Sequence, residues 1–154
     1  MSREFIVKKC MKCGAVVKVF EDCNCPGCGI RCCDEEMKVL VPNSVDASAE
    51  KHIPTYEVKD GKIFVRVNHI MEEEHYIEWI AIVYDDHEKI TYLNPGDEPV
   101  AHCKYVPGST IYAYCNKHSL WKANVEWKRQ IENTILFQIF NQLFSTEELK
   151  YAFW

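Results

Sequence analysis

The sequence lacks a signal peptide and any apolar segment long enough to cross a bilayer. Its first five residues, MSREF, have mixed charge and do not show the basic-then-apolar pattern of a leader. None of its apolar runs reaches the roughly 20 residues that a membrane-spanning helix needs. We therefore expect a soluble, cytoplasmic protein that does not act at a membrane.

An excess of positive charge is also missing. The chain has 18 Lys and Arg against 23 Asp and Glu, which gives a formal net charge of −5 over 154 residues. A general nucleic-acid binder would show a basic patch or stripe, so we do not expect a nucleic-acid partner. A hydrophobic content of 47% is enough for a packed core, and the length fits one domain with a small satellite.

Cysteine, by contrast, is abundant. Seven of the nine cysteines lie between Cys10 and Cys33. An odd number of cysteines without a secretion signal argues against a disulfide framework and favours metal ligation. So short a segment cannot fold on a hydrophobic core alone. We therefore predict a tetrathiolate metal site in a small cysteine-rich domain at residues 1–41.

Two ligand sets for this site compete. Both contain the knuckle Cys10-x-x-Cys13. In the first, the knuckle Cys25-x-x-Cys28 completes the site, as in zinc ribbons and rubredoxin-type iron sites. In the second, the adjacent residues Cys32 and Cys33 complete it. Spacing alone favours the first set.

The rest of the chain reads as β-structure followed by a helical tail. After a polar linker at 42–48, seven β-prone segments separated by turn signals predict an immunoglobulin-like antiparallel β-sandwich at residues 42–126. The expected strands are 55–58, 62–68, 76–84, 89–93, 100–105, 110–114 and 120–126. Apolar residues at helical spacing predict a helix over 127–144, and a capping box at 145–148 predicts a second helix to residue 154, so 127–154 forms a C-terminal extension. The expected fold class is mainly β.

Within this body, Cys115-Asn116-Lys117-His118 places a thiol and an imidazole three residues apart. Such a pair favours iron, zinc or copper over magnesium or calcium. A single match of this kind is a weak signal, because short motifs also occur by chance. Its significance depends on whether other donors converge on it.

Three segments, the last of which contains this pair, carry a resemblance to a known family. They are EKHIP at 50–54, HIM at 69–71 with HYIEWI at 75–80, and CNKHSLWK at 115–122. In this order and spacing they resemble the signature segments of the superoxide reductases. The cysteine-rich segment, with CMKCG at 10–14 and CCDEEMK at 32–38, resembles the desulforedoxin-like domain of desulfoferrodoxin, the two-iron class of that family. The resemblance covers about residues 5–126.

This resemblance implies a non-haem iron centre in the sandwich and a superoxide reductase activity. The implied iron ligands are four equatorial histidines and one axial cysteine, namely His52, His69, His75, His118 and Cys115. Glu50 would correspond to a glutamate that can close the open sixth position, and Lys51 to a lysine near it. A second iron, or zinc, would be bound by Cys10, Cys13, Cys32 and Cys33, which shifts the preference to the adjacent-cysteine set.

The implied reaction is the one-electron reduction of superoxide to hydrogen peroxide, with re-reduction by a rubredoxin-like electron donor, in a homodimer. The chain departs from the family pattern at Ile70, where proline is usual, and at Ser119, where glycine is usual. The insertion CNCPGC at 23–28 is also atypical. The alternative is a non-enzymatic electron carrier or zinc-ribbon interaction protein, which would not need the histidine-bearing segments.

Overall fold

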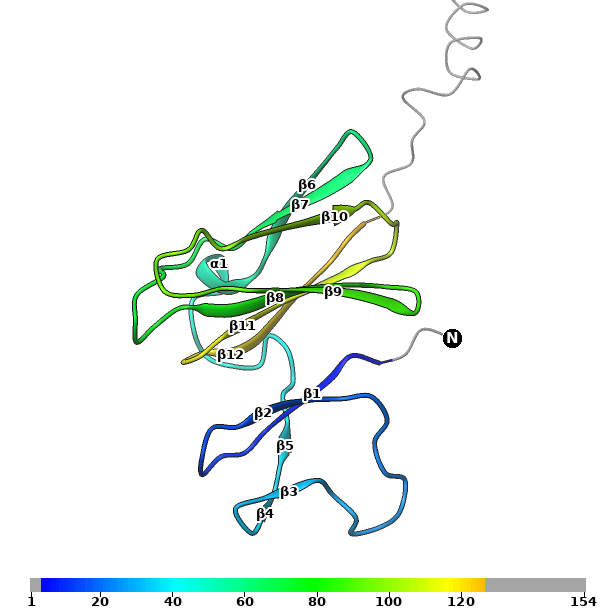
Figure 1. The fold of residues 1–154 in the computed structure, drawn as a ribbon, viewed down its shortest axis with the longest axis vertical. Coiled ribbons are helices and arrows are strands. Elements are labelled where there is room, and N and C mark those ends of the chain that lie inside the picture. Colours follow the sequence, from blue (N-terminus) through cyan, green and yellow to red (C-terminus); the bar gives the residue numbers. More distant parts are fainter. Residues whose placement is uncertain (1–3, 127–154) are drawn as a thin grey trace, which may run out of the picture.

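The computed structural model describes residues 4–126 and shows a small head below a larger body (Figure 1). The head consists of five short strands. They are β1 (Ile6–Lys9), β2 (Val16–Val19), β3 (Arg31–Cys32), β4 (Glu35–Glu36) and β5 (Lys38–Val39). The body consists of one short helix and seven strands. They are α1 (Ala49–His52), β6 (Thr55–Lys59), β7 (Lys62–Arg66), β8 (Ile77–Tyr84), β9 (His87–Tyr92), β10 (Val100–Lys104), β11 (Thr110–Cys115) and β12 (Ser119–Asn124).

The body is a sandwich of two antiparallel sheets. One sheet has the strand order β10-β7-β6 and the other β12-β11-β8-β9. The seven strands begin and end within two residues of the predicted ones, so the mainly β prediction is confirmed. The helices predicted at 127–144 and up to residue 154 lie outside the described residues. Within residues 4–126, no helix is long and apolar enough to cross a membrane.

The inner strands of the four-stranded sheet, β8 and β11, have buried residues on both faces. Successive side chains of a strand point to opposite faces. On β11, Ile111, Ala113 and Cys115 belong to the core between the two sheets, whereas Tyr112 and Tyr114 pack with the head. Cys115 is therefore the last inward-facing residue of a core strand, at one end of the sandwich.

The head packs against the outer face of this sheet. Val7 of β1 forms a buried cluster with Tyr114 and Leu120 of the body. The ring of Phe5 stacks on Tyr112 with the centroids 4.6 Å apart. Beside this cluster, Asn43 exchanges side-chain hydrogen bonds with the backbone of Lys122 and so ties the connecting segment to β12. The head is thus held by apolar packing and by paired hydrogen bonds.

An ion pair between a buried lysine and a partly exposed aspartate anchors the head internally. Lys8 is only 4% exposed, and its Nζ lies 2.7 Å from Oδ2 of Asp22. The hydrogen bond from Lys8 holds the pKa of Asp22 below its usual value. A carboxyl group whose pKa is lowered by folding stabilises the protein above its ordinary pKa near 4, and this contribution is lost as the pH falls through the lower value.

We expect Asp22→Asn to destabilise the protein at pH 7, because it leaves the buried ammonium of Lys8 without its counter-charge. The loss in the free energy of unfolding should shrink as the pH is lowered from 7 to well below the ordinary carboxyl pKa near 4, because the stability that the lowered pKa of Asp22 provides is lost in that range. Urea unfolding at both pH values measures this. Asp86→Asn, in an exposed turn, is the control. Equal destabilisation at both pH values would contradict the assigned ion pair.

Candidate metal centre

All five candidate ligands of the body lie at the same end of the sandwich. His52 precedes β6, and His69 follows β7, its antiparallel neighbour. His75 precedes β8, and Cys115 ends β11, whose last residue pairs with Ile77. His118 lies in the loop between β11 and β12. Antiparallel pairing therefore brings residues far apart in the sequence to one edge.

His52 is held by the helix that carries it. It is the last residue of α1 and is 3% exposed. Its Nδ1 lies 2.7 Å from the backbone carbonyl oxygen of Ser48, one helical turn earlier. On its other side the ring stacks on Trp121, with the centroids 4.8 Å apart and the planes 21° apart. These contacts leave Nε2 as the free nitrogen and fix its direction.

The loop between β11 and β12 positions Cys115 and His118. Cys115 pairs with Ser119 across the loop, and a register shift on β8 lies beside Cys115. Such a bulge re-aims the side chains around it. Ser119 adopts a φ of +65°, a left-handed conformation that costs most residues about 1 kcal/mol or more. That conformation explains why glycine suits this position.

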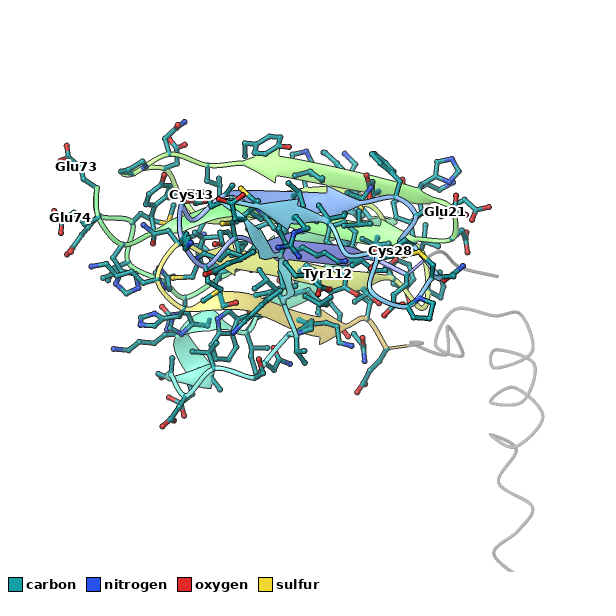
Figure 2. All side chains as sticks on the ribbon, turned by 90° about the horizontal axis from the view of Figure 1, so that it is seen from below. Cys13, Glu21, Cys28, Glu73, Glu74 and Tyr112 are labelled. Atoms are coloured by element: carbon teal, nitrogen blue, oxygen red, sulfur yellow. A yellow bond between two sulfur atoms is a disulfide. The ribbon has the colours of Figure 1, made fainter. Side chains whose placement is uncertain are left out.

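The connection between β7 and β8 carries the other two histidines. Nδ1 of His69 is hydrogen-bonded to the carbonyl oxygen of Ile70. His75 forms an isolated antiparallel bridge with Glu72, which closes a tight turn. In Figure 2, Glu73 and Glu74 of this turn project outward from the body. The acidic side chains of the turn therefore point into solvent.

The free nitrogens of the four histidines form a ring. Nε2 of His52 lies 2.9 Å from Nδ1 of His118 and 3.2 Å from Nε2 of His69. Nε2 of His75 lies 3.1 Å from Nδ1 of His118. A square with edges of 2.9–3.2 Å has its centre about 2.1–2.3 Å from each corner, close to the ~2.0–2.1 Å of a metal–imidazole bond. Sγ of Cys115 lies 3.5 Å from the His69 nitrogen, and all five donor atoms are within 4.8 Å of one another.

The proton positions also fit a bound cation. His52 and His69 each use Nδ1–H to donate to a backbone carbonyl, which leaves a lone pair on each Nε2. These two Nε2 atoms face each other at 3.2 Å, and two lone pairs at that distance repel. A metal ion at the centre of the ring would bind both. Backbone-bonded imidazoles of this kind are typical of metal ligands.

The titration behaviour of the donors supports the same conclusion. Burial lowers the pKa of His69 to about 4 and also lowers the pKa values of His75 and His118. These rings are therefore neutral at pH 7, which is the form that binds metal. Burial raises the pKa of Cys115, although the backbone N–H of His118 opposes this. A cation is needed to hold this buried sulfur as a thiolate.

One face of the ring opens to solvent. A surface pocket is lined by the four histidines together with Lys51, Asn68 and Ile70 and with residues 46–48. Cys115 is fully buried and does not line this pocket. Lys51 and Glu50 are both exposed on α1, but only Lys51 contributes to the lining. A small solute would therefore approach the ring from the side away from the sulfur.

Two supporting residues were not expected from the sequence. Trp121 is 2% exposed, stacks on His52, and donates from Nε1 to the carbonyl oxygen of His118 at 2.9 Å. Asn116 accepts the N–H of Tyr76 and donates to the carbonyl oxygen of Glu74, so it ties two ligand-bearing loops together. Both lie in the segment 115–122, but their roles depend on contacts between loops that the sequence does not reveal.

The head contains a second donor cluster. The structure brings together the sulfur atoms of Cys10, Cys13, Cys32 and Cys33 within 4.8 Å of one another. Sγ of Cys32 lies 3.6 Å from that of Cys13 and 3.8 Å from that of Cys33. Thiolates at about 2.3 Å from a tetrahedral ion are about 3.8 Å apart, so the cluster has the dimensions of a tetrathiolate site.

Two tight turns produce this cluster. Cys33 and Asp34 both have positive φ values and form the two-residue turn between β3 and β4, which presents Cys32 and Cys33 side by side. At the first knuckle, Gly14 has a φ of +78° and its N–H donates to the carbonyl oxygen of Cys10. The set that spacing alone favoured is not assembled, since Cys25 and Cys28 are joined by a disulfide in a separate cluster.

Comparison with known proteins agrees with this arrangement. The sequence model of the family described as Desulfoferrodoxin matches residues 44–124. The desulfoferrodoxin of Desulfarculus baarsii is 40% identical over 129 residues, which cover 80% of this chain and 98% of that protein. The desulfoferrodoxin of Nitratidesulfovibrio vulgaris is 36% identical over 127 residues, which cover 80% of this chain and 98% of that protein.

A solved structure shares the fold. The superoxide reductase from Treponema pallidum aligns with a TM-score of 0.56 at 24% identity and covers 76% of this chain and 98% of that one. The family match extends over more than half of this chain, and both relatives are matched over nearly their full length. The chain therefore belongs to the desulfoferrodoxin family.

Proposed function

We propose that the chain is an oxidoreductase of the superoxide reductase type, which converts superoxide to hydrogen peroxide at an iron centre. The observation that carries this proposal is the ring of four histidine nitrogens with one buried sulfur and one open face. Imidazole and thiolate together suit iron, zinc or copper. The desulfoferrodoxin relatives favour iron among these.

Bound iron would supply the single electron that superoxide must gain, with two protons, to leave as hydrogen peroxide. The chain contributes the surroundings. Four neutral imidazoles do not cancel the charge of a cation, so the open face remains attractive to an anion. Cys115 would hold the ion from the buried side, and its negative charge would make bound iron more electron-rich, as a thiolate ligand does in haem enzymes. Protons can come from water, because the pocket is open to solvent.

Lys51 and Glu50 complete the proposed site. Lys51 lines the pocket and would draw superoxide toward a chain whose net charge is otherwise negative. A local positive charge of this kind can raise association rates by about tenfold or more. We assign to Glu50, exposed on α1, the role of a carboxylate that covers the open face between turnovers.

We expect Lys51→Ala to slow the reaction with superoxide by about tenfold at low ionic strength and to weaken its salt dependence. Stopped-flow or pulse-radiolysis rates at several salt concentrations measure this. Lys59→Ala is the matched control, because Lys59 is also exposed but lies at the other end of β6. Identical rates for the Lys51→Ala variant and the wild type at low salt would remove the steering role.

The oxidised centre must be reduced again. We propose that a rubredoxin-like donor supplies the electron, and that residues 1–41 and 42–126 act as two domains, the first binding iron or zinc in its tetrathiolate site. The supporting geometry is the separate cluster of Cys10, Cys13, Cys32 and Cys33. This cluster lies in the head, which packs on the outer face of the sheet that carries Cys115.

Metal analysis combined with visible spectroscopy of the purified, oxidised protein tests the proposal. We expect iron in an environment with one sulfur ligand, and a second metal ion in an all-sulfur environment. Zinc in place of iron in the second environment would change the assignment of the head and leave the activity intact. A protein that binds no iron at the histidine ring would contradict the proposed function.

A further inference from the structure

A third donor cluster, made of three cysteines, lies outside both candidate metal sites. It belongs to the loop between β2 and β3 and contains Cys23, Cys25 and Cys28. Cys25 and Cys28 are joined by a disulfide, while Cys23 is a free, exposed thiol. The three sulfur atoms lie within 4.8 Å of one another. A free thiol thus stands beside a disulfide, as thiol–disulfide exchange requires.

The structure fixes both ends of this loop. At its start, the backbone N–H of Cys23 donates to Oδ1 of Asp22 at 2.9 Å, and Asp22 is held by the buried Lys8. At its end, the backbone N–H of Met37 donates to the carbonyl oxygen of Ile30 at 2.8 Å. The segment between these anchors turns through Gly27, which has a φ of +77°. The cluster is therefore a consequence of how the loop is tethered.

The disulfide is open to solvent and separate from the tetrathiolate cluster. Cys23 and Cys25 are exposed and Cys28 is half-buried. Figure 2 shows Cys28 and Cys13 well apart in the head, so the two sulfur clusters do not share donors. A reagent in solution can thus reach Cys25 without disturbing the ligands of the other site.

We propose that Cys25 and Cys28 form a reversible dithiol–disulfide couple that exchanges electrons with an external dithiol. One thiolate of the dithiol attacks Sγ of Cys25, the S–S bond breaks, and Cys28 leaves as a thiolate that takes up a proton. The second thiol of the dithiol then attacks the mixed disulfide and releases Cys25. Two electrons and two protons pass to the pair, and the dithiol becomes a disulfide.

Cys23 can also exchange with this disulfide from within the protein. Its thiolate lies within reach of both sulfur atoms of the disulfide, so it can open the bond and form a disulfide with Cys25 or Cys28 in its place. Such an exchange conserves electrons, because one disulfide replaces another. We therefore expect disulfides of three pairings in the oxidised protein, with Cys23 as the thiol that interconverts them.

The test uses the metal-loaded, full-length protein in mixtures of reduced and oxidised dithiothreitol. Free thiols are trapped by rapid alkylation with excess maleimide at neutral pH, and the mass of the peptide that contains residues 23–28 is measured by mass spectrometry. As the fraction of reduced dithiothreitol rises, the peptide should gain two alkyl groups. It should lose them again when that fraction falls. The metal content of the protein should stay constant at every ratio, which separates this loop from the tetrathiolate site.

Two variants test the separate roles of Cys23 and of the disulfide. Cys23→Ser should keep the two-thiol transition and lose the alternative disulfide pairings. Replacing both Cys23 and Cys25 by serine should abolish the transition. Three outcomes would overturn the proposal: full alkylation at every dithiothreitol ratio, a disulfide that opens only in denaturant, or thiols that stay blocked in the reduced protein until a chelator removes a metal ion.

Discussion

Replacing Cys115 by serine is expected to abolish superoxide reduction while the head keeps its bound metal. Cys115 is the only sulfur in the five-donor set of the body and is fully buried. Serine has a similar size but stays a neutral hydroxyl at pH 7, so the buried negative charge is lost. Losing even an outer partner of a metal ligand costs about 10–100-fold in metal affinity or activity. We expect the loss of a ligand itself to exceed about 100-fold in rate.

Rates of superoxide consumption together with visible spectra measure this effect. Cys103→Ala is the matched control, because Cys103 is buried in the same core but belongs to neither donor cluster. It should keep full activity once it is folded and loaded with metal. A Cys115→Ser variant that retains iron and wild-type rates would show that the sulfur is not the residue that controls the reaction.

The second large effect concerns stability. Ile80 is fully buried on β8, in the centre of the core between the two sheets. Ile80→Ala removes three carbon atoms and leaves a cavity, and such substitutions cost about 2–5 kcal/mol. The free energy of unfolding from urea titration should fall by this amount. β8 pairs with both β9 and β11, so its neighbours cannot easily collapse into the space.

Val41→Ala is the control for this prediction. Val41 is 60% exposed, so shortening its side chain should change the free energy of unfolding by less than about 0.5 kcal/mol. Both variants should be compared at equal metal content, because bound metal stabilises the folded state by mass action. A loss for Ile80→Ala as small as that for Val41→Ala would contradict the assigned core.

Much of the body could be predicted from the sequence, because each strand is short and is bounded by turn signals. Buried and exposed residues alternate along β7, with Ile63 and Val65 buried, and this pattern can be read from the sequence of the strand alone. The histidines were predictable for a related reason. His52, His69 and His75 lie at the ends of strands, in segments that together with Cys115-x-x-His118 resemble a family pattern. Antiparallel pairing then brings these ends together, as the register of β8 with β11 shows.

The choice of cysteines in the head was not predictable from spacing. Spacing favoured the two C-x-x-C knuckles, but their sulfur atoms lie in separate groups. Spacing counts residues and does not show which way a turn presents them. The two-residue turn at Cys33 and Asp34, with both φ values positive, places Cys32 and Cys33 beside the first knuckle. Cys25 and Cys28 are instead held away by the anchored loop. The stacking of Trp121 on His52 likewise depends on tertiary contacts.

The central proposal is that iron held by the histidine ring reduces superoxide and does not dismutate it. The most direct test measures the products when the reduced, iron-loaded protein reacts with a known amount of superoxide. Our account predicts one hydrogen peroxide for each superoxide consumed, one electron lost by the protein, and no oxygen evolved. One oxygen for every two superoxide ions, with the protein unchanged, would identify a dismutase and contradict the account.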